Sequence, residues 1–343
     1  MKKEIKLVKN IVLSNFNKSY VFPCPYKLTF SLTYKCNLRC KICRIWEVPY
    51  RKELDINEVE KIFKGLRNLS WLDLTGGEIT LREDLMEIVK VIIKNSKKLL
   101  IFHISTNGQL PHKIFSVVKN ILKKGLLPIV NISIDGPRKV NDYLRGKNSA
   151  YFNSIETFKM LKTFKKGFYY ISCTISNYNI KYLDEFISEL KKDITFLSFS
   201  DLHFNIFHNS SHYYHNQDVE CISQLRPDIV MQYLELSKGR TLVKQFLEDR
   251  YIKGMIKYFN GDRFPVTCQA LKSSCFINPY GEVYPCGFFN RVIGDLKDYD
   301  YNLEKVWEGY DILKVRRDIE NKNCPGCWTP CEAFTSILGK IFS

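Results

Sequence analysis

Three cysteines near the N-terminus have the types and spacing of metal ligands. Cys36, Cys40 and Cys43 form a C-x3-C-x2-C run directly after a short apolar segment. A [4Fe–4S] cluster usually takes four cysteine thiolates, so three leave one iron free for an outside ligand. A zinc knuckle or unligated thiols are the alternatives, but zinc needs a fourth ligand, and the next candidate, Cys24, lies in a separate segment between two prolines. The run favours a cluster with an open iron, which implies chemistry.

A second group of cysteines lies near the C-terminus. Seventeen residues separate Cys268 from Cys286, and the segment 276–286 predicts a hairpin with a glycine at its turn. The run Cys324-Pro-Gly-Cys327-Trp-Thr-Pro-Cys331 follows. Four of these thiolates suit either a second iron–sulfur cluster or a tetrahedral zinc site. Such clustering indicates bound metal in a reducing compartment rather than a disulfide scaffold.

Polar motifs that contain glycine follow three of the predicted strands. They are Thr75-Gly76-Gly77-Glu78, Ser105-Thr106-Asn107-Gly108, and Asn131-Ile-Ser133-Ile-Asp135-Gly136-Pro137 with the later segment 141–146, which contains Arg145. Glycines let a backbone approach a ligand closely, and active residues gather at the carboxyl ends of parallel strands. We therefore expect these motifs near the first cysteine group, although the second motif and the Asp135-Gly136 pair are equally consistent with ordinary turns.

A repeated pattern of β-rich run, turn and amphipathic segment predicts parallel α/β architecture. Asp55 and Glu58 predict a capping box at the first helix. Six units fall short of the eight that close a full barrel, so the pattern alone permits an open sheet or a partial barrel. The predicted strands are Leu28–Tyr34, Trp71–Thr75, Leu99–Ser105, Leu127–Ile134, Phe168–Ile175 and Ile194–Phe199.

The chain divides into four predicted regions. Residues 1–26 form a lysine-rich amphipathic extension, and 27–202 carry the βα units. Residues 203–264 form a bridging segment, and 265–343 form a small cysteine-rich domain of hairpin and helix. The bridge holds four histidines that we expect to be solvated or to line the substrate site rather than to bind metal. They are His203, His208, His212 and His215.

The cysteine run and the polar motifs together resemble the radical S-adenosylmethionine (SAM) superfamily. The resemblance implies a partial (β/α)6 TIM-like barrel in which Cys36, Cys40 and Cys43 hold the [4Fe–4S] cluster that cleaves SAM. Two departures, Ile42 before the last cysteine and Ile79 after the Gly-Gly-Glu motif, lie beside the matching residues.

The same resemblance implies roles for the polar motifs. Gly76, Gly77 and Glu78 match the family's GGE motif, whose backbone receives the SAM amino group. Ser133 and Arg145 match residues that help to bind SAM, and the planar fork of the arginine suits a carboxylate.

The C-terminal cysteines resemble a SPASM or twitch domain, which binds auxiliary [4Fe–4S] clusters. The similarity rests on a C-x12-G-x4-C spacing followed by C-x2-C. A full SPASM domain has more cysteines and two clusters, so we expect one auxiliary cluster here. Its expected ligands are Cys268 and Cys286 with two of Cys324, Cys327 and Cys331, of which the first two are favoured and Cys331 stays open. We expect Cys173, Cys221 and Cys275 to be buried rather than ligating.

By resemblance, the reduced first cluster passes an electron into SAM, and the resulting 5′-deoxyadenosyl radical removes a hydrogen atom from the substrate. An external one-electron reductant of ferredoxin or flavodoxin type supplies the electron. Only about 27 residues precede the first strand, which mildly favours a small molecule such as a sugar, lipid or cofactor precursor. The alternatives are a maturase that modifies a peptide or protein, and a non-catalytic electron carrier, which would not need Ser133, Arg145 or the GGE motif.

Composition argues against several other classes. The 343-residue chain is 45% hydrophobic and has no apolar run near the roughly 20 residues of a membrane-spanning helix. Its formal net charge of +16 is spread along the chain without a nucleic-acid-binding motif, so we expect no nucleic-acid partner. No export signal is evident, and the sequence favours the cytoplasm.

Overall fold

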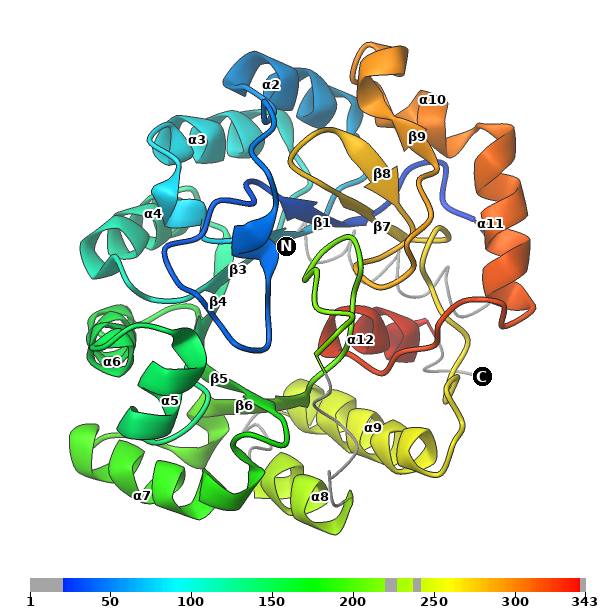
Figure 1. Cartoon of the computed structure of the whole chain (residues 1–343). Helices are drawn as coiled ribbons and strands as arrows, with labels where there is room; N and C mark the ends of the chain where they lie inside the picture. The colour runs from blue at the N-terminus through cyan, green and yellow to red at the C-terminus, as the bar shows by residue number, and fades with distance from the viewer. Residues whose placement is uncertain (1–20, 220–226, 237–241, 340–343) are drawn as a thin grey trace.

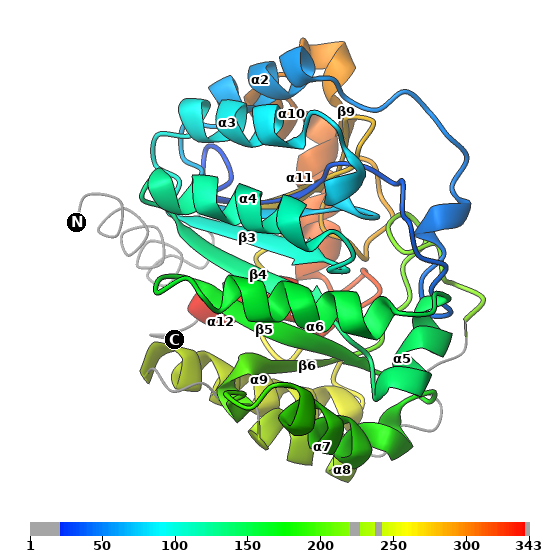
Figure 2. The same ribbon diagram turned by 90° about the vertical axis from the view of Figure 1, so that its left-hand side faces the viewer.

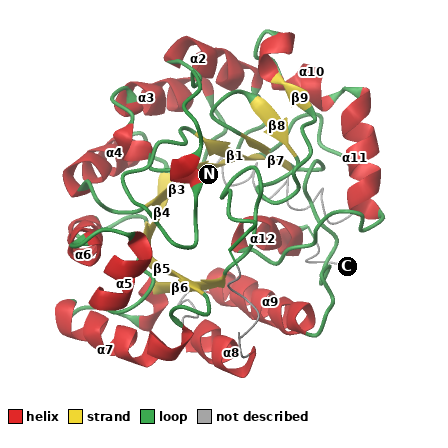
Figure 3. Ribbon diagram, in the orientation of Figure 1, coloured by secondary structure: helices red, strands yellow, loops and turns green. Residues whose placement is uncertain are grey.

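The computed structural model describes residues 21–219, 227–236 and 242–339. Six parallel strands curve around a central space, with helices on their outer side (Figures 1 and 3). The predicted α/β class with a partial barrel is confirmed. The barrel strands are β1 (Lys27–Ser31), β2 (Trp71–Thr75), β3 (Ile101–Thr106), β4 (Leu127–Ser133), β5 (Phe168–Ile175) and β6 (Leu202–Ile206).

Amphipathic helices connect these strands and bury their apolar faces against the sheet. The capping box of the first helix is confirmed, because the Asp55 carboxylate accepts the Glu58 N–H while the Glu58 carboxylate accepts the Asp55 N–H. The connecting helices are α2 (Ile56–Gly65), α3 (Leu85–Asn95), α4 (Pro111–Lys123), α5 (Arg138–Arg145), α6 (Ala150–Leu161) and α7 (Leu183–Asp193). Figure 2 shows them side on, along the outside of the sheet.

Further helices follow the barrel strands in sequence. They are α8 (Pro227–Leu236), α9 (Leu242–Phe259), α10 (Leu303–Trp307), α11 (Tyr310–Glu320) and α12 (Pro330–Leu338). Short 3-10 helices are η1 (Ile45–Glu47), η2 (Ile79–Leu81), η3 (Ile180–Tyr182), η4 (Phe199–Asp201) and η5 (Leu296–Tyr299).

The C-terminal strands extend the barrel sheet. β7 (Ser274–Ile277) pairs in parallel with β1, and β8 (Glu282–Tyr284) and β9 (Gly294–Asp295) add antiparallel strands. The described strands form one sheet in the order β6-β5-β4-β3-β2-β1-β7-β8-β9. The predicted hairpin is confirmed, with Gly281 at its turn in a conformation that favours glycine (φ 93°). This pairing also covers the β1 edge, which would otherwise leave backbone groups unpaired.

Helix α12 lies where the ring of strands is open, between β6 and β7 (Figure 1). On the β7 side, the Ser274 hydroxyl donates to the Glu332 carboxylate at 3.4 Å. On the β6 side, the ring of Phe334 lies 6.5 Å from that of His203. The C-terminal helix therefore fills the place that further strands occupy in a full barrel.

The sixth strand differs from its prediction. The sequence predicts it at 194–199, but α7 ends at Asp193, residues 194–198 form a turn that leads into η4, and the strand is β6, Leu202–Ile206. In β6 buried Leu202, Phe204 and Ile206 alternate with partly exposed His203 and Asn205. The two polar side chains line the central cavity, so the segment lacks the apolar run that marks the other strands.

The inner side of the barrel is polar, while the outer side packs against the helices. Leu72 and Leu74 of β2 belong to the apolar core, whereas Asp73 between them lines the central cavity. The same alternation on other strands sends polar side chains inward. They are Thr29, His103, Asn131, Ser172 and Thr174.

The described part of the chain contains no helix that is long and apolar enough to cross a membrane. Most of the predicted extension 1–26 lies outside the described residues. The predicted boundary between 202 and 203 falls inside β6, so the barrel strands end a few residues later than that division. The remaining boundaries stay predictions.

Two cysteine-lined cavities as the candidate functional site

The first cysteine group lies on the loop after β1 and lines a cavity of about 250 Å³. The end of α5 holds this loop in place. The N–H of Arg39 donates to the Arg145 carbonyl at 3.1 Å, and the N–H of Lys41 donates to the Leu144 carbonyl at 2.8 Å. Gly146 follows with φ 64°, and a Cβ there would lie 2.4 Å from the Arg39 carbonyl oxygen. The glycine is therefore needed for the close approach of the two segments.

The Gly-Gly-Glu segment after β2 packs against the same loop. The N–H of Gly77 donates to the Thr33 carbonyl at 2.7 Å, and a Cβ on Gly77 would lie 2.3 Å from the Lys35 carbonyl oxygen. Gly76 and Gly77 both line the cavity. Backbone, rather than side chains, therefore faces the cavity beside the cysteine loop.

Glu78 has a different position from the two glycines. Its side chain is buried and does not line the cavity. It accepts hydrogen bonds from the Thr80 and Thr106 hydroxyls and from the N–H of Asn107 at 2.7 Å. The carboxylate thus joins the turns after β2 and β3. Asn107 in turn donates to the Asn37 side chain at 2.8 Å, which fixes the cysteine loop from a third side.

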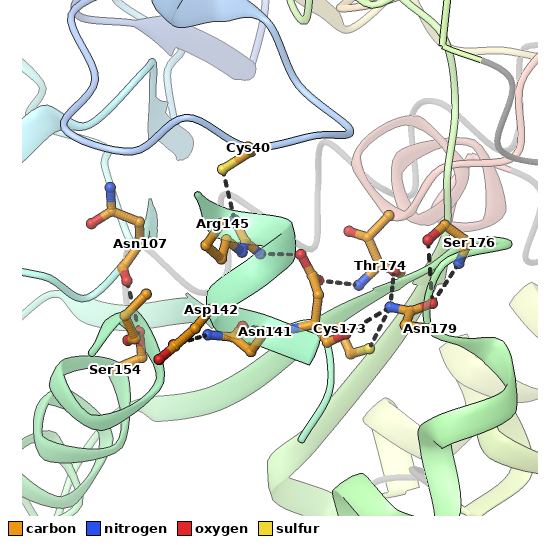
Figure 4. Close-up of polar contacts among 12 residues, drawn as sticks. Cys40, Asn107, Asn141, Asp142, Arg145, Ser154, Cys173, Thr174, Ser176 and Asn179 are labelled. Atoms are coloured by element: carbon orange, nitrogen blue, oxygen red, sulfur yellow. Dashed lines mark hydrogen bonds and ion pairs between the residues drawn. The ribbon is translucent and has the colours of Figure 1, made fainter. Parts of the chain in front are cut away.

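Arg145 links the cysteine loop to Asp135, which follows β4. Its Nη2 lies 2.5 Å from Asp135 Oδ2, and its Nη1 lies 3.9 Å from the Cys40 sulfur (Figure 4). Asp135 is fully buried and also accepts the N–H of Thr174 at 2.9 Å. Burial raises the pKa of Asp135, and the adjacent guanidinium and the Thr174 N–H oppose that effect. The sequence places both residues in one motif, but only the fold shows that their side chains form an ion pair.

The donor groups of this cavity fit a SAM-binding cluster. The buried Nε of Arg145 has no hydrogen-bond partner, and Arg145 and Ser133 both line the cavity beside the cysteines. An unpaired guanidinium donor suits a carboxylate such as that of SAM. Burial raises the pKa of the Cys36 thiol to about 11, so iron must displace protons when it binds.

Four other cysteines line a smaller cavity of about 40 Å³ in the C-terminal region. They are Cys268, Cys286, Cys324 and Cys327. Burial raises the pKa values of these thiols. The charge of Cys324 further raises the pKa values of Cys268 and Cys327. Backbone N–H groups of Ala270 and Phe289 donate to the sulfurs of Cys268 and Cys286, each at 3.4 Å. Across the described residues, no three His, Cys, Asp or Glu side chains are close enough to hold a single metal ion.

Cys331 is not with these four cysteines. It lines the large cavity together with the first cysteine group, and its charged neighbours are Lys27, Asp73 and Glu332. The structure therefore groups Cys324 and Cys327, rather than Cys331, with Cys268 and Cys286.

Other cysteines and two of the bridge histidines are buried where the structure describes them. Cys173 and Cys275 lie in the apolar core, as expected, while Cys221 lies outside the described residues. His212 Nε2 lies 3.0 Å from the Cys286 carbonyl oxygen, and His208 Nε2 accepts the N–H of Trp328 at 3.3 Å. These two histidines connect the bridge to the C-terminal region.

Comparison with known proteins agrees with this arrangement. The Radical SAM superfamily model matches residues 30–190, and the SPASM iron–sulfur cluster-binding domain model matches residues 268–328. The AdoMet-dependent heme synthase of Methanosarcina barkeri is 22% identical over 88% of this chain and 91% of its own. The antilisterial bacteriocin subtilosin biosynthesis protein AlbA of Bacillus subtilis is 26% identical over 90% of this chain and 68% of its own.

Solved structures share the fold. Native anSMEcpe with bound AdoMet has a TM-score of 0.59 at 18% identity, covering 93% of this chain and 92% of its own. Streptococcus suis SuiB bound to S-adenosylmethionine has a TM-score of 0.61 at 15% identity, covering 93% and 73%. The cofactors are accordingly [4Fe–4S] clusters and SAM. The chain belongs to the radical SAM superfamily and carries a SPASM iron–sulfur domain.

Proposed function

We propose that the large cavity is the active site, in which SAM is cleaved reductively and a hydrogen atom is removed from a polar substrate. The observation that carries this proposal is the meeting of three thiols, two glycines and an unpaired arginine donor in one cavity. When bound to Cys36, Cys40 and Cys43, the reduced cluster supplies the electron that cleaves SAM.

The residues around the cysteines bind and orient SAM in this proposal. Arg145 binds the carboxylate of SAM through Nε while Asp135 holds its Nη2. Ser133 hydrogen-bonds the same end of SAM, and the backbone of Gly76 and Gly77 receives the amino group. Glu78 acts indirectly, because its carboxylate fixes the Thr106–Asn107 turn rather than facing the cavity.

The inner barrel wall supports a polar substrate. Asp73, His103, Asn131 and Ser172 line the cavity below the cysteine loop. Such groups fix the orientation of a ligand through hydrogen bonds, and Asp73 and His103 are themselves held in place by their mutual contact. Because the cluster and SAM must share this cavity, the remaining space suits a small polar molecule or one side chain of a longer substrate.

A peptide is the second candidate substrate. The Mycolicibacterium smegmatis mycofactocin maturase MftC is 24% identical over 92% of this chain, and SuiB of the same fold is known bound to the precursor peptide SuiA. A bound peptide would place one side chain in the cavity and the rest of its length along the open mouth.

We further propose that Cys268, Cys286, Cys324 and Cys327 hold one auxiliary cluster, which exchanges electrons with the substrate. A ferredoxin- or flavodoxin-type protein is the external reductant, and a reducing cytoplasm keeps the thiols available for iron. The division into a barrel, a bridging segment and a C-terminal cysteine-rich region is part of this proposal, with β6 assigned to the barrel.

Two measurements test the proposal: reductive cleavage of SAM, and transfer of deuterium from the substrate to 5′-deoxyadenosine. Anaerobically reconstituted protein, reduced in the presence of SAM, should form 5′-deoxyadenosine and methionine in equal amounts. Two sets of candidate substrates are then deuterated at carbon: small molecules, and precursor peptides encoded by neighbouring genes. Only the true substrate should transfer deuterium to 5′-deoxyadenosine. Failure to form 5′-deoxyadenosine at all would refute the proposal.

A further inference from the structure

We propose that Cys331 is a catalytic thiol that donates a hydrogen atom to a carbon-centred radical in the large cavity. This inference rests on the proposed function and assigns a second reactive group to the same site. Its basis is a cysteine outside both sets of cluster ligands, whose exposed side chain lines the cavity in which the radical forms.

A contact from β1 holds Cys331 in this position. Lys27, the first residue of β1, is fully buried and donates from its Nζ to the Cys331 carbonyl oxygen. The same Nζ lies 3.2 Å from the Asp73 carboxylate, which lines the cavity on β2. Cys331 occupies the first turn of α12, the helix in the open side of the barrel. The two strands thereby fix the end of α12 that faces the cavity.

A second group beside Cys331 is ready to bind a ligand. Thr329 is the N-cap residue of α12, but its side chain makes no capping hydrogen bond. It is 6% exposed, lines the same cavity, and its Oγ1 has no hydrogen-bond partner. A buried hydroxyl without a partner costs free energy, and a polar substrate in the cavity would provide that partner. A substrate bound to Thr329, which precedes Cys331 by two positions in the chain, would then lie beside the thiol.

The chemistry follows from the weak S–H bond. In the proposed step, the S–H bond of Cys331 breaks homolytically and a C–H bond forms on the substrate radical. The sulfur keeps one unpaired electron. One electron from the external reductant and one proton from solvent then restore the thiol, so that atoms and electrons balance.

The surroundings keep Cys331 in its thiol form. Its side chain opens to the cavity, but protein surrounds it on the other sides, and this burial raises the pKa of the thiol to about 12. Asp73 and Glu332 raise it further, whereas Lys27 lowers it. The group therefore carries its hydrogen at neutral pH, as a hydrogen-atom donor must.

The first test uses SAM alone in D2O, where thiols carry deuterium. Without substrate, the deoxyadenosyl group takes hydrogen from nearby protein groups, and O–D and N–D bonds are too strong to supply it. Wild-type protein should form deuterated 5′-deoxyadenosine, and Cys331→Ala and Cys331→Ser should lower the deuterium content to the level found in H2O. Cys275→Ala, which removes a thiol from the apolar core, should leave it unchanged. Equal deuterium content in wild type and both Cys331 variants would overturn the proposal.

A second test does not depend on SAM cleavage, and so separates this proposal from the proposed function. Iron and sulfide are measured in anaerobically reconstituted wild-type protein and in two single variants. Cys331→Ala should keep the full iron content, whereas Cys324→Ala should lose the iron of the C-terminal site. Loss of iron in Cys331→Ala would identify Cys331 as a cluster ligand and refute its role as a donor.

Discussion

The two cysteine-lined cavities differ in the number of cysteines that could hold a cluster and in the polarity of their walls. The large cavity presents three cysteines on one loop, and polar side chains from several strands complete its wall. The small cavity presents four cysteines from three segments, mostly among apolar side chains such as Val266, Phe288 and Trp328. Three thiolates leave an iron open to a ligand, whereas four complete the coordination of a cluster. In the proposed assignment, ligand number and wall polarity together distinguish the reactive site from the site of the auxiliary cluster.

Removal of the first cysteine group should have the largest effect. The Cys36→Ala/Cys40→Ala/Cys43→Ala variant should lose SAM cleavage completely, because no cluster remains in the large cavity. Its iron content should fall from roughly eight to about four atoms per chain. Iron and sulfide analysis with product chromatography checks this. Retained cleavage of SAM would mean that the reactive cluster lies elsewhere.

Removal of two C-terminal cysteines should separate SAM cleavage from turnover of the substrate. Cys324→Ala/Cys327→Ala should also lose about four iron atoms. SAM cleavage should persist, because the large cavity is intact, while turnover of the true substrate should fail. Mössbauer spectra of the matched Cys275→Ala variant should show both clusters. Zinc in place of iron at this site would contradict the assignment.

Lys27 connects the barrel to the C-terminal helix, since it contacts Asp73 on β2 and the start of α12. Although burial acts in the opposite direction, Lys27 and His103 hold the pKa of Asp73 well below its ordinary range. That stabilisation is present above the unfolded-state pKa of about 3.9 and is lost only in stronger acid, so it is complete at neutral pH. Lys27→Met leaves Asp73 buried without this partner and should lower the free energy of unfolding by about 3–5 kcal/mol at pH 7.

Denaturant unfolding under anaerobic conditions measures that cost. The double variant Lys27→Met/Asp73→Asn should recover much of the loss, because no buried charge is then left unpaired. Equal destabilisation of the single and double variants would show that the ion pair does not connect the two regions.

Arg145→Lys should have the smallest of these effects. Lysine keeps the positive charge but cannot present Nε and Nη2 in one planar fork, so SAM should bind about ten- to a hundredfold more weakly. Equilibrium dialysis of the reconstituted protein measures this change. Arg138→Lys, at the exposed start of the same helix, is the matched control and should bind SAM normally. Unchanged affinity in Arg145→Lys would remove this arginine from the SAM site.

The sequence predicted the barrel well where strands are apolar. The strands Trp71–Thr75 and Phe168–Ile175 have the predicted bounds, because buried residues and turn residues delimit them clearly. It misplaced the sixth strand, since His203 and Asn205 face the cavity and hide the strand pattern. Local periodicity could not reveal the parallel pairing of β7 with β1, which joins segments far apart in the chain.

The candidate site was predictable as residue types, but not as a set of neighbours. The motifs indicated the cysteine loop and the two glycines, and spacing favoured Cys324 and Cys327 over Cys331. Spacing could not show that Cys331 lines the other cavity, because Cys327 lies on the loop before α12 and the direction of Cys331 depends on how that helix packs. The buried partners Asp135 and Glu78 likewise depend on tertiary contacts.

The most direct test of the open iron is electron paramagnetic resonance of the Cys324→Ala/Cys327→Ala variant, which should hold only the first cluster. The spectrum of the reduced protein should change when SAM is added, because SAM binds the iron that Cys36, Cys40 and Cys43 leave free. An unchanged spectrum from fully iron-loaded protein at saturating SAM would contradict the account.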